Sequence, residues 1–213
     1  MKQVGESGER VDFYAFLSRM FLEEPPRELA DDIASSKFQL FEMPASNEDF
    51  DEGIIILRKF MKTEKDADKM YESMCKEYTR LFLGPVPDVF PYESMYIDGS
   101  MMGKSLLSVK KEYMIAGLMK AAGFHEPEDH IAMELQFMSY LCKDGSKKGL
   151  QKDFLNNHLL KWTPLFCDEL SEKSRSDFYR GIGKLLKGFL VIDKENRALF
   201  KQGFFFIATV PYS

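Results

Sequence analysis

Hydrophobic residues recur at helical spacing along most of the 213-residue chain. Apolar side chains three and four positions apart share one face of an α-helix, so such a stripe indicates a helix that packs on a core. The stripes predict helices over residues 10–24, 27–35, 46–62, 66–83, 105–122, 127–142 and 148–162, and one that begins near 174. Strands that would alternate with these helices are missing from the pattern. We therefore predict an all-α fold of about eight helices.

Boundary signals support several of these helices. Pro25 and Pro26 should end the first helix, and Ser46 is suited to cap the third. Ser174 with Asp177 matches a capping box for the last helix, whereas Pro164 should kink or divide the helix before it. The helix over 127–142 is apolar around most of its girth, which predicts a central, buried position.

Residues 84–104 interrupt the helical pattern. Three glycines and three prolines fall in this segment, which has no helical period. A loop of this length inside a compact domain is more often functional or mobile than a plain connection. Its aromatic and methionine side chains either pin the loop to the core or offer an adaptable apolar surface to a peptide: Phe90, Tyr92, Met95, Tyr96, Met101 and Met102.

Composition narrows the class of protein. Hydrophobic residues make up 45% and charged residues 30%, as in a globular protein, and the net charge of −5 argues against nucleic-acid binding. The three cysteines form no CxxC pair, which favours a reducing compartment. Residues 1–10 show no apolar signal region, and no apolar run approaches the ~20 residues needed to span a bilayer. We expect a cytoplasmic protein without stable membrane insertion.

An acidic, histidine-bearing stretch from Gly123 to His130 precedes the central helix. A metal site here would use Glu126, Asp129, His130 and Glu134, but a helical di-iron site needs two Glu-x-x-His copies, and this spacing differs. From the residues alone, carboxylates that stabilise the first turn of a helix are the favoured interpretation. The other interpretation is a contact site, because paired carboxylates suit a guanidinium.

Catalytic sequence motifs are missing. The chain contains no GxGxxG, GxxxxGK[ST], HExxH or GxSxG pattern. We therefore expect a binding protein without catalytic residues, resident metal or cofactor. The alternative from another class is a helical metal-dependent enzyme using Asp129, His130 and Glu134. A third reading, a plain helical scaffold, predicts that changes at Glu126, Asp129 and His130 alter stability only.

Three ordered motifs resemble the TorD/DmsD/NarJ-like chaperones that help molybdenum-containing redox enzymes to mature. They are Glu77-Tyr78-Thr79-Arg80-Leu81-Phe82-Leu83-Gly84-Pro85, Pro91-Tyr92-Glu93-Ser94-Met95-Tyr96 and Glu126-Pro127-Glu128-Asp129-His130. A weaker match joins Phe154-Leu155 with His158, Trp162 and Pro164, followed by Phe178-Tyr179. Together these matches extend over about residues 70–190. Tyr78 stands where some members carry Trp.

The resemblance implies an all-helical chaperone over residues 1–213, with lobes at about 10–122 and 127–213 and a hinge near 123–129. It implies binding of the twin-arginine signal peptide, or another segment, of an apo-molybdoenzyme catalytic subunit. Such binding assists cofactor insertion and delays export. It also implies a monomer or a homodimer, with exchange of lobes as one route to the dimer.

Carried onto this sequence, the resemblance implies a partner-binding site from the matched motifs. The apolar part of the leader would lie on the loop and on Tyr78, Leu81 and Phe82. Its arginines would approach Asp129, Glu126 or Glu93, with His130 orienting the carboxylate. The full set of expected partner-binding residues is Tyr78, Leu81, Phe82, Pro85, Tyr92, Glu93, Ser94, Tyr96, Glu126, Pro127, Asp129, His130 and Glu134.

Overall fold

A computed structural model describes residues 6–38, 40, 47–121 and 125–195. These ranges confirm the all-α class: they hold helices and no strand, and one isolated backbone bridge joins Tyr92 to His130. No helix within them is both long enough and apolar enough to span a bilayer. The α-helices are α1 (Glu6–Leu22), α2 (Arg27–Ala34), α3 (Glu48–Thr63), α4 (Ala67–Tyr78), α5 (Glu93–Ile97), α6 (Lys104–Ile115), α7 (Ile131–Cys142), α8 (Lys148–Phe154), α9 (Leu160–Lys173) and α10 (Asp177–Glu195). Two π-helical turns, Thr79–Leu83 and Leu155–Leu159, follow α4 and α8, and a 3₁₀ turn spans Gly145–Lys147.

The chain divides into two compact units, and each unit is assembled from two separate segments. Unit 1 comprises residues 1–22 and 90–166, and unit 2 comprises 23–89 and 167–213. The predicted contiguous lobes, 10–122 and 127–213, divide the chain differently and stay a prediction. Residues 123–124 of the predicted hinge and the segment 196–213 lie outside the described residues.

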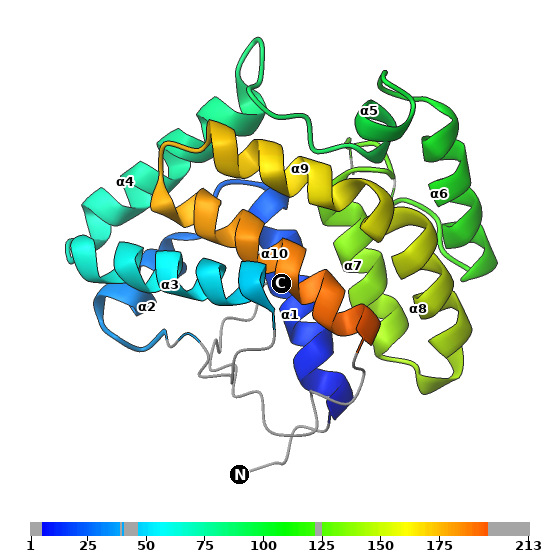
Figure 1. The fold of residues 1–213 in the computed structure, drawn as a ribbon, viewed down its shortest axis with the longest axis horizontal. Coiled ribbons are helices and arrows are strands. Elements are labelled where there is room, and N and C mark those ends of the chain that lie inside the picture. Colours follow the sequence, from blue (N-terminus) through cyan, green and yellow to red (C-terminus); the bar gives the residue numbers. More distant parts are fainter. Residues whose placement is uncertain (1–5, 39, 41–46, 122–124, 196–213) are drawn as a thin grey trace. The chain divides into compact units, whose positions relative to one another are not determined.

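In unit 1, α1 packs along α7, and Figure 1 shows the two helices side by side. The contact is apolar, with Phe13, Leu17, Leu135 and Met138 at most 1% exposed. Hydroxyl groups join the helices at two further points: Ser18 Oγ donates to the Ala132 carbonyl at 2.7 Å, and Ser139 Oγ donates to the Val11 carbonyl at 3.0 Å. The predicted central position of the 127–142 helix is thereby confirmed for α7, which is buried along nearly its whole length.

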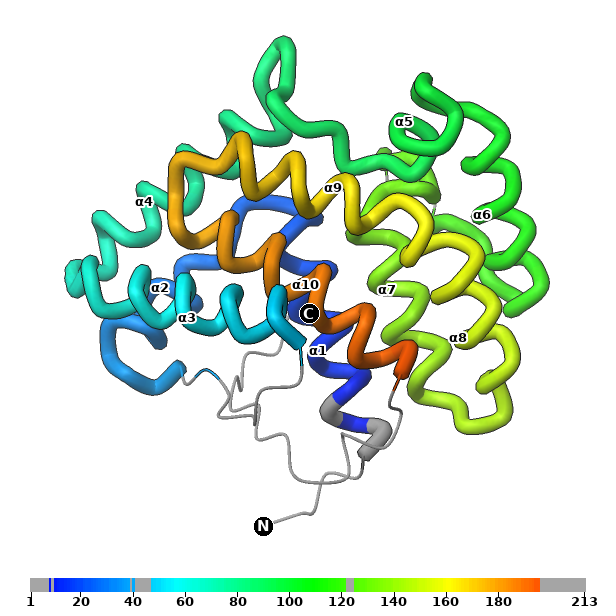
Figure 2. Tube along the Cα trace, in the orientation of Figure 1, coloured from blue at the N-terminus to red at the C-terminus, as the bar shows by residue number. Residues whose placement is uncertain are grey.

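In unit 2, α3 and α10 lie against each other, as the cyan and orange segments of Figures 1 and 2 show. Glycines allow this close approach. A Cβ atom at Gly53 would lie 2.7 Å from the Leu185 backbone nitrogen, and one at Gly181 would lie 2.6 Å from the Leu57 side chain. Contacts below 3.0 Å are not tolerated by backbone atoms, so the interface depends on these small residues.

Two predicted helix bounds are wrong for identifiable reasons. The helix predicted over 105–122 ends at Ile115, because Gly117 adopts φ +78° and begins a Schellman turn. In that turn Leu118 N donates to the Tyr113 carbonyl and Gly117 N to the Met114 carbonyl. The helix predicted from Pro127 begins only at Ile131, because residues 128–129 form a turn and His130 is extended. The Asp129 carbonyl and Ile131 N instead form hydrogen bonds with Glu93 N and the Pro91 carbonyl.

The 84–104 loop, Pro164 and two predicted helix caps also differ from the prediction. The 84–104 loop contains α5, which the sequence pattern did not reveal. Pro164 lies inside α9, which continues to Lys173, so the predicted division at this proline is wrong; the irregular turn lies upstream, at 155–159. The cap of α10 is Ser176, whose Oγ accepts from Phe178 N, rather than Ser174. Ser46 lies outside the described residues, and Asn47 caps α3.

Candidate functional site

Two motif segments of unit 1 are joined by backbone hydrogen bonds. Glu93 N donates to the Asp129 carbonyl at 2.9 Å, and Ile131 N donates to the Pro91 carbonyl at 2.8 Å. The side chain of Asp129 adds a third bond, because its Oδ2 accepts from Ser94 N at 3.0 Å. Asp129 is 0% exposed and therefore serves as a buried cap for the first turn of α5, from 35 residues away.

His130 caps the following helix. Its Nδ1 accepts a hydrogen bond from Ala132 N at 3.1 Å, at the start of α7. Burial lowers the pKa of His130 from 6.5 to about 3, which keeps the ring neutral and its Nδ1 free to accept. The edge of the ring contacts Tyr92, with centroids 5.1 Å apart. In the structure His130 holds the start of α7, and its predicted role in orienting a carboxylate stays a prediction.

Behind this joint lies a buried polar cluster. Glu134 is 0% exposed, and its Oε2 accepts from Trp162 Nε1 at 3.1 Å. Nδ1 of His158 lies 2.9 Å from Oε2 of Glu93, and both side chains are buried. Burial raises the pKa of Glu134 well above 4.5, and the charge of Glu93 and a hydrogen bond to it add to the rise.

The raised pKa of Glu134 agrees with its surroundings. Its Oε1 has no hydrogen-bond donor among the described residues, and neither has Oδ1 of Asp129. A proton on Glu134 turns this oxygen into a donor toward Glu93, which a pair of ionised carboxylates could not achieve. The cluster is therefore suited to holding α5, α7 and the 155–162 segment together, and not to meeting solvent.

The solvent-facing part of the unit 1 site consists of Tyr92, Tyr96, Glu126 and Pro127, which are each partly exposed. The Tyr92 hydroxyl donates to Oε2 of Glu126 at 2.7 Å. Lys120 Nζ donates to the Glu126 carbonyl at 3.1 Å, which fixes the backbone there. Among the predicted carboxylates, Glu93, Asp129 and Glu134 are buried, so Glu126 is the one that an incoming cation reaches first.

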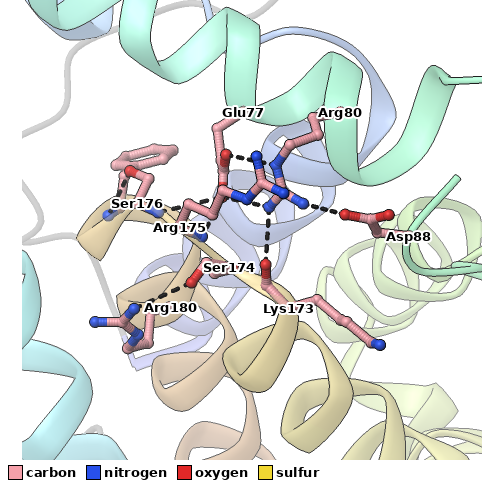
Figure 3. A network of polar contacts seen from close by, with 9 residues as sticks. Glu77, Arg80, Asp88, Lys173, Ser174, Arg175, Ser176 and Arg180 are labelled. Carbon is pink, nitrogen blue, oxygen red and sulfur yellow. Dashed lines mark hydrogen bonds and ion pairs between the residues drawn. The ribbon is translucent and has the colours of Figure 1, made fainter.

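The first motif lies in unit 2, where Glu77 holds the turn between α9 and α10 (Figure 3). Its Oε1 accepts from the backbone nitrogens of Arg175 and Ser176, and both its oxygens accept from the Arg80 guanidinium at 2.8 and 3.0 Å. Arg80 also donates to the Lys173 carbonyl, the last residue of α9, and pairs with Asp88. Burial alone would raise the pKa of Glu77, but these hydrogen bonds outweigh it and lower the pKa.

The aromatic part of this motif is mostly core. Tyr78 and Leu81 are 3% and 0% exposed, and Tyr78 packs beside Phe82 and Tyr179 with centroids 5.2 and 6.2 Å apart. Phe82 is partly exposed, and Pro85 is exposed. Of the four predicted residues in unit 2, these last two have surface that a partner can contact.

The predicted metal ligands do not form a coordination set. Among the described residues, no three His, Cys, Asp or Glu side chains gather in an arrangement that could hold a metal ion. Asp129, His130 and Glu134 each engage a different group of the protein: Ser94 N, Ala132 N and Trp162 Nε1.

Comparison with known proteins identifies the family of this chain. Residues 44–168 match the model of the family described as nitrate reductase delta subunit. The chain belongs to the nitrate reductase delta subunit family. The chaperone protein TorD of Aliivibrio salmonicida is 27% identical over 203 residues, covering 87% of this chain and 93% of that protein.

One further relative and one solved structure are similar to this chain. The protein of Haemophilus influenzae named "Probable Tat proofreading chaperone DmsD" is 31% identical over 134 residues, covering 59% of this chain and 64% of that protein. A crystal structure of a proposed redox enzyme maturation protein from Archaeoglobus fulgidus has the same fold, with a TM-score of 0.54 at 24% identity over 85% of this chain and 93% of that one. The TorD and DmsD relatives are named as chaperones, and the chain is a chaperone and not an enzyme. The alternative of a metal-dependent enzyme using Asp129, His130 and Glu134 is not supported.

Sequence reasoning missed three members of the unit 1 cluster. His158 and Trp162 belong only to the weaker family match, although their spacing of four residues places both on one helix face. Tyr113 lies on the apolar stripe of the 105–122 segment, which gives no sign that its hydroxyl donates to the Glu128 carbonyl at 2.9 Å. Through hydrogen bonds to Glu93, Glu128 and Glu134, these residues hold the motif segments in place from the interior of unit 1.

Proposed function

We propose that this chain is a cytoplasmic maturation chaperone that binds the twin-arginine leader, or another segment, of a molybdenum enzyme's catalytic subunit. Binding would retain the subunit until its cofactor has been inserted. Support comes from the family, whose description names a nitrate reductase subunit, and from relatives whose names refer to chaperones and to Tat proofreading. The twin-arginine feature of the client supplies a basic peptide, which the acidic motif of unit 1 suits.

Glu126 carries this proposal, because it is a partly exposed carboxylate held in a fixed direction. The Tyr92 hydroxyl binds one oxygen, Oε2, at 2.7 Å, which leaves Oε1 for a further donor. A guanidinium can donate to such an oxygen with a charge-assisted bond. Ile97, which is exposed on α5 five residues after Tyr92, offers apolar surface for the hydrophobic part of a leader. Asp129 and Glu93 support this surface from behind and do not line it.

Calorimetric titration with a leader peptide tests the proposal. We expect Glu126→Gln to weaken binding about tenfold, because the amide keeps the shape but removes the charge from a partly exposed pair. Asp153→Asn is a matched control, because Asp153 is an exposed carboxylate on α8 of the same unit and should have no effect. A leader with both arginines replaced by glutamine should bind weakly to the unchanged chain and show no further loss with Glu126→Gln. Equal affinity of the two leaders would contradict the proposed recognition of arginine.

The client itself can be identified by purifying the tagged chain from its native host. We expect the catalytic subunit of a molybdenum enzyme to co-purify, and light scattering of the purified complex and of the free chain would give the oligomeric state. We propose a monomer or a homodimer for the free chain. A partner without any molybdenum enzyme subunit would contradict the proposed role.

A further inference from the structure

Helix α6 buries one face and exposes a second face that is unusually apolar. Its inner side carries Leu106, Val109 and Tyr113, all buried. On its outer side Leu107, Met114 and Ile115 are 66%, 70% and 55% exposed. Single exposed apolar residues are ordinary, but three on one helix face form a patch that suits a partner. None of these three side chains takes part in the motifs of the proposed leader site.

Two lysines run through the middle of this outer face. At 3.6 residues per turn, Lys111 lies between the line of Leu107 and Met114 on one side and Ile115 on the other. Lys104 lies two turns before Lys111, almost on the same line. Both lysines are exposed, and neither forms an ion pair with any of the described side chains. The neighbouring Lys110 differs, because it is partly exposed and its Nζ lies 3.4 Å from Glu128.

We propose that this outer face of α6 is a second docking surface, and that it binds an acidic amphipathic helix in the mature part of the client subunit. The inference rests on the proposed function for the existence of a client, but it concerns a different segment from the basic leader. The α6 docking surface consists of Lys104, Leu107, Lys111, Met114 and Ile115.

Charge and spacing identify this occupant. A partner helix can place two carboxylates seven residues apart, which matches the separation of about 10.5 Å between Lys104 and Lys111 along α6. Apolar residues on both sides of those carboxylates would cover Leu107, Met114 and Ile115. A basic leader would be repelled by the same lysines, so the two surfaces are selective for different segments.

An anionic membrane is the other surface that attracts lysines and apolar side chains, but the arrangement on α6 favours a protein. A helix that lies on a membrane has an apolar centre, with its cations at the borders where they reach the headgroups. On α6 the charged residue Lys111 occupies the centre of the stripe, where a membrane would have to bury it. A protein partner can place a carboxylate at that point.

The test uses the full-length chain, the purified client subunit without its leader, and the leader peptide alone. We expect the double variant Lys104→Glu/Lys111→Glu to lower affinity for the leader-deleted subunit at least about tenfold, as like charges then face each other. Lys148→Glu/Lys152→Glu on α8 is the matched control, with the same change in net charge at exposed lysines of the same unit. Both double variants should bind the leader peptide as the unchanged chain does. Circular dichroism and thermal unfolding of each variant exclude loss of fold as the cause.

A photoreactive benzoylphenylalanine at position 107 then reports what covers the surface. We expect a cross-link to a segment of the leader-deleted subunit that carries two acidic residues seven positions apart. Equal affinity of both double variants for this subunit would overturn the inference and leave the proposed function intact. So would a cross-link only to a second copy of the chain, a cross-link only within the chain, or lysine-dependent binding only to phosphatidylglycerol vesicles. If the unchanged chain did not bind the leader peptide, the proposed function would be contradicted instead. The affinities of the double variants for the leader-deleted subunit would still test the α6 docking surface.

Discussion

Replacement of His130 by asparagine separates its hydrogen bond at the start of α7 from its ability to bind a proton. The ring caps α7 through Nδ1, which accepts from Ala132 N, and it is 4% exposed. Asparagine is among the most favourable N-cap residues and can accept the same hydrogen bond, but it does not titrate. The variant should therefore keep the cap and lose the sensitivity of the site to acid.

The size of the effect follows from the pKa of His130, which burial lowers from 6.5 to about 3. The unfolded chain binds a proton on this residue below about pH 6.5, whereas the folded chain does not until about pH 3. The contribution of the neutral ring to stability is therefore full above pH 6.5 and is lost as the pH falls from 6.5 toward 3. At about 1.4 kcal/mol per pKa unit, the loss is about 2 kcal/mol at pH 5 and approaches about 5 kcal/mol near pH 3.

Urea unfolding followed by circular dichroism, at several pH values from about 7.5 to 4.5, measures this difference. The free energy of unfolding of His130→Asn, relative to that of the unchanged chain, should rise steadily as the pH falls below 6.5. His125→Asn is the matched control, because His125 is exposed and should leave the pH dependence unchanged. Parallel pH curves for His130→Asn and the unchanged chain would refute the account of a buried, neutral cap.

Two further changes test the interiors of the units. Because burial raises the pKa of Glu134, its contribution to the free energy of unfolding is full below about pH 4.5 and is lost as the pH rises. Each pH unit in this range costs up to about 1.4 kcal/mol. Glu134→Gln does not titrate, so urea unfolding of this variant should lack that loss. Unchanged slopes with pH would contradict a buried protonated carboxyl. Gly53→Ala should destabilise unit 2 by about 1–3 kcal/mol despite the better helix propensity of alanine, because the new Cβ would meet Leu185 N at 2.7 Å. Gly149→Ala on α8, where nothing lies within 4 Å, should instead stabilise by up to about 1 kcal/mol, and equal stabilities of the two variants would contradict the packing.

Periodicity alone predicted the helices that bury a continuous apolar stripe. The predicted 66–83 helix is found as α4 and the π turn that follows it, the predicted 27–35 helix matches α2 closely, and the predicted 10–24 helix overlaps α1, which begins four residues earlier. In these segments the local pattern and the core agree. Helix ends were predictable only where the capping residue is local. The end of α6 at Ile115, in place of the predicted 122, depends on the positive φ of Gly117, which composition does not reveal.

α5 shows why an element that depends on a distant residue could not be predicted from the sequence. It is five residues long and has no useful periodicity, and its first turn is capped by Asp129, which lies 35 residues further along the chain. No local signal in the 84–104 segment reports that cap. The same contact explains the error over the carboxylates: Asp129 is a cap as expected, but of α5 and not of the helix that follows it.

The sequence predicted which motifs form the candidate site. It did not predict which residues of those motifs are buried and which are exposed. Family resemblance named both segments that meet at the Tyr92–His130 bridge. Residue type gave no means to tell Glu126, which keeps solvent contact, from Glu134, which is 0% exposed. That difference arises from tertiary packing around Trp162.

The buried state of Asp129 determines how variants of this motif should be interpreted. Its Oδ2 holds the first turn of α5, and its carbonyl holds Glu93 N, so removal of the carboxylate would release the segment that carries Tyr92. Peptide binding would then fall even if no arginine ever touched Asp129. Glu126 provides the cleaner test, because its side chain accepts from a tyrosine hydroxyl and supports no backbone amide in the described part of the chain. A loss of affinity at Glu126 with unchanged stability therefore indicates a contact, whereas equal losses of affinity and stability at Asp129 indicate only that the surface needs its support.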